Sequence, residues 1–134
     1  MYFLDTNVLV DYVTKREPHY ESSKRLFKTF DERKEVVSTS IICMTTTIYF
    51  AQKNLGNLNG RRAIQKLKEL VEVLPALPIN LDWALESRFD DLEDALQHHI
   101  AESNGCKAII TRNKKDFKHS NLAILTPEEL LATI

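Results

Sequence analysis

Short apolar runs alternate with longer amphipathic segments along the whole chain. Four of these runs have the length and composition of buried strands, and a fifth contains two prolines that would limit its ladder of hydrogen bonds. The five predicted strands are residues 1–4, 35–40, 73–80, 108–112 and 122–125. Between them, apolar residues recur at helical spacing. The predicted helices are residues 7–15, 20–30, 61–72, 81–89, 91–104 and 126–134.

Residues 41–55 are apolar nearly all round, so the pattern fits a buried helix or a strand, and we predict a helix. The stretch "GNLNG" at 56–60 is typical of a turn or loop. Strands that alternate with helices predict an α/β fold with a mostly parallel sheet. In such folds ligands bind outside the carboxyl ends of the strands.

Composition fits one globular domain over residues 1–134, with 43% hydrophobic and 28% charged residues. The formal net charge of -1 gives no overall signal for nucleic acid, although a local basic patch remains compatible with RNA. Two cysteines, Cys43 and Cys106, have no metal or redox spacing and are expected to be reduced core thiols. No apolar run approaches the length of a transmembrane helix, so we expect a cytoplasmic protein.

Acidic residues follow or precede several of the predicted elements. Asp5 ends the first strand, where a charge is costly unless it is hydrogen-bonded, paired or bound to a cation. Asp91 and Asp94 open a helix, and Asp116 follows the fourth strand. Each has an ordinary alternative role: Asp5 as a helix N-cap, Asp91 and Asp94 as favourable charges in a first turn, and Asp116 as a solvated loop residue.

These acids come from separate elements that would meet at one edge of the sheet. Carboxylates brought together in this way repel one another unless a cation neutralises them. Oxygen ligands suit Mg²⁺ or Mn²⁺ better than zinc. Such an ion can orient a water for attack on a phosphodiester. The sequence therefore predicts metal-dependent phosphoester hydrolysis.

Three stretches resemble the PIN domain, a family of metal-dependent ribonucleases whose commonest bacterial members are the toxins of VapBC-type toxin–antitoxin pairs. They are "FLDTNVLVDY", "DLEDALQHHIAESNGCKAIITRNKKDF" and "ILTPEELL", and they span nearly the whole chain in the expected order. The resemblance implies a three-layer α/β/α sandwich around a central, mostly parallel sheet. It also implies a ribonuclease that pairs with a small antitoxin protein.

The resemblance also assigns individual residues. It implies that Asp5, Asp94 and Asp116 are the catalytic acids and bind Mg²⁺ or Mn²⁺. Supporting roles fall to nearby polar residues, which are Asn7, Asp91, Thr111 and Asn113. The basic residues around Asp116 would form a rim that holds RNA phosphates, or would simply be a solvated loop. They are Arg112, Lys114 and Lys115.

One position departs from the family pattern. The family usually has a glutamate in the helix after the second strand, within a stretch resembling "xEIYY". Here the matching stretch is "TTIYF", and Thr47 stands at the glutamate position. A threonine hydroxyl can contact a metal-bound water but supplies no charge. We therefore expect Thr47 to face the metal cleft, and we expect Thr47→Glu to bind the ion more tightly.

Two other functions fit parts of the sequence. A PIN-like module that binds RNA or protein without cleaving it is favoured by Thr47. A haloacid-dehalogenase-type phosphatase is favoured by "FLDTNVL", but that chemistry needs a general acid where Asn7 stands. Apolar residues beyond the needs of one core, including Tyr49 and Phe50, predict a homodimer.

Overall fold

The computed structural model describes residues 1–134 and contains a five-stranded sheet in the order β3-β2-β1-β4-β5. Every neighbouring pair of strands is parallel, as the sequence predicted. The strands are three or four residues long and have their most buried side chains in the centre, where Phe3, Leu4, Ile109 and Ile110 are fully buried. The strands are β1 Tyr2–Leu4, β2 Val37–Ser40, β3 Glu72–Leu74, β4 Ala108–Ile110 and β5 Ala123–Leu125.

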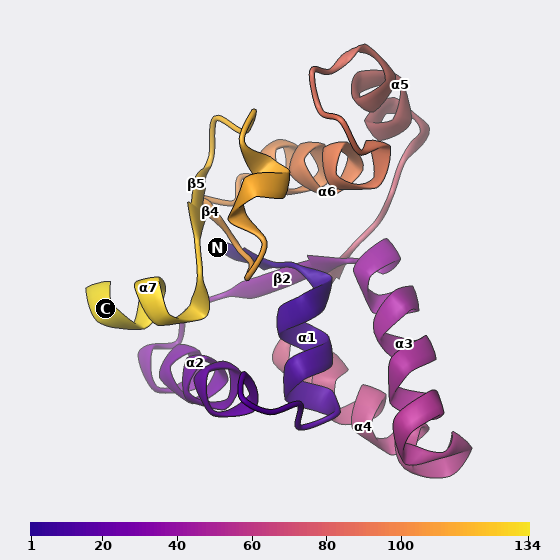
Figure 1. Ribbon diagram of the computed structural model, residues 1–134, viewed down its shortest axis with the longest axis vertical. Helices are drawn as coiled ribbons and strands as arrows, with labels where there is room; N and C mark the ends of the chain where they lie inside the picture. Colours follow the sequence, from indigo (N-terminus) through magenta and orange to yellow (C-terminus); the bar gives the residue numbers. More distant parts are fainter.

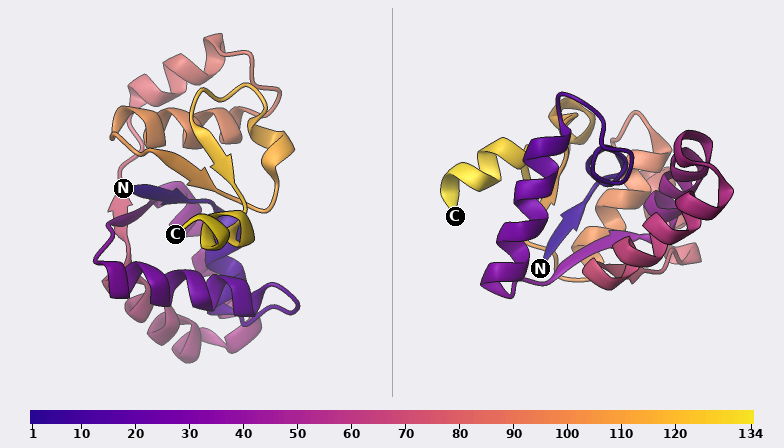
Figure 2. Two further views of the ribbon diagram at one scale, coloured as in Figure 1. Left: turned by 90° about the vertical axis from the view of Figure 1, so that its left-hand side faces the viewer. Right: turned by 90° about the horizontal axis from the view of Figure 1, so that it is seen from below.

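Helices enclose the sheet in two layers (Figure 1, Figure 2), which gives the expected three-layer α/β/α sandwich. One layer contains α1 Thr6–Val13, α2 Tyr20–Arg33, α3 Ile41–Leu55 and α4 Asn57–Leu70. The other contains α5 Pro78–Glu86 and α6 Leu92–Ser103. The 3-10 helix η1, Lys114–Phe117, lies between β4 and β5, and α7, Pro127–Thr133, packs beside α2. Every helix is too short or too polar to span a bilayer.

The connections between strands change face at the centre of the sheet. The helices that join β1 to β2 and β2 to β3 lie on one face, whereas α5 and α6 carry the chain from β3 across the other face to β4 (Figure 1). The ends of β1 and β4 therefore lie side by side at the point where the strand order reverses. In parallel α/β sheets the crevice at this point is the usual ligand site.

Two segments differ from the expectation drawn from the sequence. Residues 57–60 are not a loop, because α4 begins at Asn57 and only Gly56, with φ of +85°, separates it from α3. Gly60 serves close helix packing instead: a Cβ there would lie 2.8 Å from Cα of Gln52 in α3. The strand expected at 73–80 ends at Leu74, and Pro78 starts α5, where a proline costs no hydrogen bond.

Candidate active site

Asp5 follows β1 directly and is both a helix cap and part of a polar network. It is the N-cap of α1, and its Oδ1 accepts a hydrogen bond of 2.8 Å from the Thr6 amide. Its Oδ2 accepts one of 2.8 Å from the Thr111 hydroxyl at the end of β4. The N-cap role expected as the ordinary alternative is therefore present. It leaves the second carboxylate oxygen facing the neighbouring strand end.

Thr111 and Asn7 tie the ends of β1 and β4 together. The fully buried Thr111 hydroxyl accepts hydrogen bonds from Asn7 Nδ2 at 3.0 Å and from the Asn113 amide at 3.1 Å. Asn7 Oδ1 in turn accepts from the Arg112 amide at 3.1 Å. Both side chains thus have their donors and acceptors satisfied within this network. Their effect is to fix the carboxylate of Asp5 relative to the loop that follows β4.

The start of α6 supplies the second group of acids. Asp91 is the N-cap, and its Oδ1 accepts hydrogen bonds from the amides of Glu93 at 2.8 Å and Asp94 at 3.1 Å. Capping in this way begins the helix at Leu92 and directs Glu93 and Asp94 into the crevice. Glu93 was not expected at the site. Glutamates are common in the first turn of helices, so nothing in the sequence marks Glu93 as a site residue.

These elements surround a cleft of about 270 Å³. The predicted acids Asp5, Asp94 and Asp116 all line it, as do Asn7 and Asn113. The remaining lining residues come from α1, the loop after it, α3 and α6, and they are Thr6, Val10, Arg16, Thr46, Phe50 and Glu93. A neighbouring hollow shares Asp94 and Asp116 and is also lined by Asp91 and Lys115. The cleft thus contains four carboxylates and a single cationic side chain.

The electrostatics of the cleft show that its negative charge is not compensated. Burial, reinforced by Asp91, Asp116, Asp5 and Glu93, raises the pKa of Asp94 to about 7. Burial also raises the pKa of Asp5, with smaller contributions from Asp116 and Glu93, against the opposing effect of its hydrogen bonds from Thr111 and Thr6. A carboxyl group that holds its proton to neutral pH marks a place where a positive charge would be favourable.

The donor set fits a hard divalent cation. All of the acidic groups offer oxygen ligands, which Mg²⁺ and Mn²⁺ prefer. As the side chains stand, no three His, Cys, Asp or Glu groups are close enough to one another to hold an ion together. Mg²⁺ needs only one or two carboxylates and keeps several waters, so one or two of the four carboxylates would be enough to hold a partly hydrated ion.

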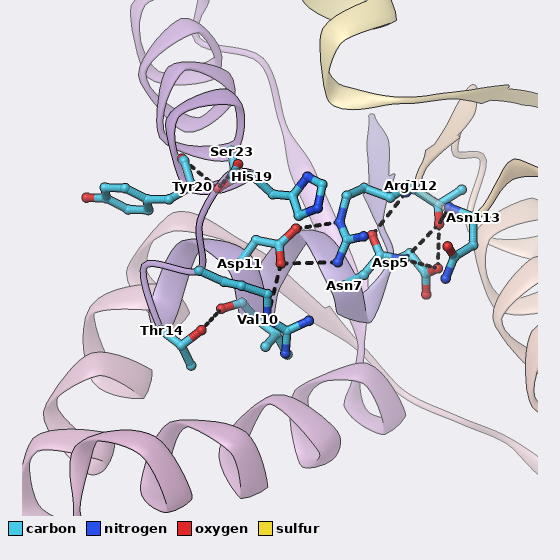
Figure 3. Close-up of polar contacts among 12 residues, drawn as sticks. Asp5, Asn7, Val10, Asp11, Thr14, His19, Tyr20, Ser23, Arg112 and Asn113 are labelled. Carbon is cyan, nitrogen blue, oxygen red and sulfur yellow. Dashed lines mark hydrogen bonds and ion pairs between the residues drawn. The ribbon is translucent and has the colours of Figure 1, made fainter.

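A partly buried ion pair connects α1 to the loop that carries Asn113 and Asp116. Asp11 of α1 is almost completely buried, and Arg112 binds it through Nε at 2.7 Å and Nη2 at 3.3 Å (Figure 3). The guanidinium of Arg112 is therefore engaged with Asp11, with 24% of the side chain exposed, and its place in an RNA-binding rim stays a prediction. Lys114 lies at the surface with its ammonium on both carboxylate oxygens of Glu129, at 2.9 and 3.0 Å.

Thr47 does not face the cleft, so that expectation was wrong. Its side chain is fully buried, and its hydroxyl donates to the Cys43 carbonyl at 2.8 Å within α3. The residue of α3 that lines the cleft is Thr46, one position earlier, together with Phe50 one turn later. The helix after β2 therefore still contributes a hydroxyl to the cleft and no carboxylate, but from a different threonine.

Comparison with known proteins gives a consistent result. The family model described as PIN domain matches residues 1–115. Ribonuclease VapC1 of Aquifex aeolicus (strain VF5) is 31% identical over 135 residues, covering 95% of this chain and 90% of that protein.

Two solved structures have the same fold at lower identity. A toxin–antitoxin complex from Klebsiella pneumoniae contains a chain with a TM-score of 0.71 and 21% identity, covering 95% of this chain and 98% of that one. VapC20 of Mycobacterium tuberculosis, a sarcin-ricin-loop-cleaving toxin, has a TM-score of 0.66 and 19% identity, covering 81% and 87%. From the match over residues 1–115 and the identity to Ribonuclease VapC1, the chain belongs to the PIN domain family.

Proposed function

We propose that this protein is a divalent-cation-dependent ribonuclease and the toxin of a toxin–antitoxin pair. The observation that carries the proposal is the uncompensated group of four carboxylates at the point where the strand order reverses, with the pKa of Asp94 raised to about 7. The naming of the relative as Ribonuclease VapC1, 31% identical over nearly the whole chain, supports RNA as the substrate.

Asp5, Asp94 and Asp116 are the residues that would hold Mg²⁺ or Mn²⁺. When bound, the cation supplies the positive charge that activates a water and stabilises the negative charge developing on the phosphodiester. The chain's own contribution is to hold the acids in place: Thr111 donates to Asp5 and Asp91 caps the turn that presents Asp94. Preorganised ligands of this kind avoid the cost of rearrangement during the reaction.

Protons and the cation compete for the same carboxylate. Because the pKa of Asp94 lies near 7 without the ion, this side chain is protonated in mildly acidic solution. Metal ligands must be deprotonated, so the affinity for Mg²⁺ should fall as the pH falls below about 7. Cleavage limited by the ion should follow the same pH dependence.

The test is substitution of the acids followed by measurement of RNA cleavage with Mg²⁺ or Mn²⁺. Asp5→Asn and Asp94→Asn should each reduce the rate by more than about 100-fold, since even the outer partners of metal ligands account for about 10- to 100-fold. Asp82→Asn is the matched control, because Asp82 is exposed on α5 and lies outside the cleft. Undiminished cleavage by folded Asp5→Asn protein would contradict the proposal.

A second function is favoured by α3, which presents Thr46 to the cleft where the family usually has a glutamate. The chain would then bind RNA or a protein without cleaving it. RNA binding with no cleavage at saturating Mn²⁺ would favour this alternative. The phosphatase alternative is not supported, because the amide of Asn7 is engaged with Asp5 and Thr111 and offers no acidic proton.

The proposed partners are a small antitoxin and a second copy of the chain. The Klebsiella pneumoniae structure of the same fold is a toxin–antitoxin complex, which supports the first. Apolar side chains exposed on α3 and α4, such as Tyr49 and Leu58 with 59% and 60% of their surface accessible, support a homodimer. Light scattering at micromolar concentration should give twice the mass of one chain, and a monomer alone would contradict the homodimer.

A further inference from the structure

Arg16 is the single cationic side chain that lines the acidic cleft. It lies in the loop between α1 and α2, and its backbone is held firmly there. Its amide donates to the Asp11 carbonyl at 3.0 Å, and its own carbonyl accepts from the amides of His19 at 3.1 Å and Tyr20 at 2.8 Å. These hydrogen bonds fix the backbone of Arg16 at the rim of the cleft.

The guanidinium group, in contrast, is only weakly engaged. Its Nε is 3.8 Å from Oδ1 of Asp11, which is beyond hydrogen-bonding distance, and 44% of the side chain is exposed. Arg112 already binds Asp11 through two hydrogen bonds. Asp11 therefore stays paired when Arg16 moves away from it, and the movement leaves no buried charge alone.

Arg16 can offset the repulsion between the acidic cleft and the phosphates of an RNA strand. Four carboxylates repel a polyanionic strand, and they outnumber the charges of one bound divalent cation together with Arg16. None of these four acids lies within ion-pair distance of Arg16, whose one acidic neighbour is Asp11 at 3.8 Å, a carboxylate that Arg112 already binds. A guanidinium presents a planar fork of donors that matches two phosphate oxygens.

We propose that Arg16 binds a phosphate of the RNA strand at the rim of the cleft, and that the Asp11–Arg112 pair keeps its guanidinium available for this contact. The inference rests on the proposed ribonuclease function and adds a substrate-binding residue to it. It predicts that Arg16 contributes to RNA binding and to turnover, and not to binding of the metal ion.

The experiment compares the wild-type protein with Arg16→Gln, Arg16→Lys and the control Arg25→Gln. Arg25 is exposed on α2 outside the cleft, so its replacement makes the same change in net charge elsewhere. Three quantities are measured: kcat/KM on a mixed-sequence single-stranded RNA with Mn²⁺, the salt dependence of binding to its 2′-O-methyl analogue, and Mn²⁺ affinity by calorimetry.

Arg16→Gln should lower kcat/KM by about 10- to 100-fold, the range for loss of a charge-assisted hydrogen bond. It should also reduce the slope of log affinity against log salt by about 0.7, which is one phosphate contact on a single strand. Arg16→Lys should restore the slope but only part of kcat/KM, because an ammonium lacks the fork. Mn²⁺ affinity should be unchanged or higher, and Arg25→Gln should match the wild type.

The inference is overturned if Arg16→Gln keeps the wild-type kcat/KM and salt slope while the wild type cleaves RNA. It is also overturned if Arg16→Gln loses Mn²⁺ affinity in proportion to its rate, because Arg16 would then act on the acids and not on the substrate. A wild-type protein that binds Mn²⁺ but neither binds nor cleaves RNA would overturn the proposed function, and this inference with it.

Discussion

Asp94→Asn should stabilise the metal-free protein at alkaline pH. In the folded chain the pKa of Asp94 is about 7, against an ordinary value of 3.8. At a pH between these two pKa values, Asp94 therefore holds a proton in the folded protein that it has lost in the unfolded chain. The free energy of unfolding must then decrease as the pH rises through this interval, because stability falls with pH wherever the folded state binds more protons. Above about pH 7 the penalty is complete and constant.

The magnitude follows from the size of the shift. A rise from 3.8 to about 7 sets an upper limit of about 4 kcal/mol, at 1.36 kcal/mol for each pKa unit. Asp94 is only half-buried, and solvent screens its interactions, so we expect about 1–2 kcal/mol. Its carboxylate accepts no hydrogen bond that an asparagine would lose. At about pH 4, where Asp94 is protonated in the folded protein, the two proteins should be equally stable.

The assay is urea unfolding followed by the fluorescence of Trp83, the only tryptophan of the chain. The free energies of unfolding of the wild type and Asp94→Asn are measured in the presence of a chelator at about pH 4 and about pH 8. Only the difference between the two proteins at each pH is interpreted. Mn²⁺ added at the higher pH should stabilise the wild type much more than the variant, because it binds the folded state. A variant that is equal to or less stable than the wild type at the higher pH would refute the electrostatic argument.

Four further substitutions test other features. Thr46→Glu should add a carboxylate to the cleft and bind Mn²⁺ more tightly by calorimetry, whereas Thr47→Glu should place a charge in the core and cost several kcal/mol of stability without tighter binding. Gly60→Ala should lower the free energy of unfolding by about 1–3 kcal/mol, because the new methyl group meets the backbone of Gln52; an unchanged urea midpoint would contradict this packing. Asp11→Asn should cost about 1–3 kcal/mol, because the partly exposed guanidinium of Arg112 loses its carboxylate partner; an unchanged temperature of thermal unfolding at constant salt would contradict this.

Elements with strong local signals could be predicted from the sequence. Ser40 caps α3, and its hydroxyl accepts from the Cys43 amide at 3.0 Å, so the helix begins directly after β2 as expected. Thr126 caps α7 in the same way, with Pro127 in the first turn. The start of α4 was missed because Gly60 is also a good turn residue, and its use in helix packing depends on Gln52, which only the folded chain brings close.

Part of the site could likewise be predicted from the sequence and part could not. Asp5 and Asp116 could be placed together because each follows a strand, and parallel strands end at one edge. The orientation of α3 could not be predicted, since its sequence is apolar nearly all round and gives no preferred face. One residue along a helix is a rotation of about 100°, which is the difference between Thr46 in the cleft and Thr47 in the core.

The absence of a glutamate from α3 does not leave the cleft short of negative charge. Glu93 lines it beside Asp94, so α6 contributes two acids while α3 contributes the hydroxyl of Thr46. The attraction of a cleft for a divalent cation depends on the total charge of the carboxylates that line it and not on which helix carries them. Burial is the main cause of the raised pKa of Asp94, and the nearby carboxylates of Asp91, Asp116, Asp5 and Glu93 raise that pKa further. On this argument Glu93 offsets in charge the carboxylate that α3 lacks, and we expect RNA cleavage and not RNA binding alone.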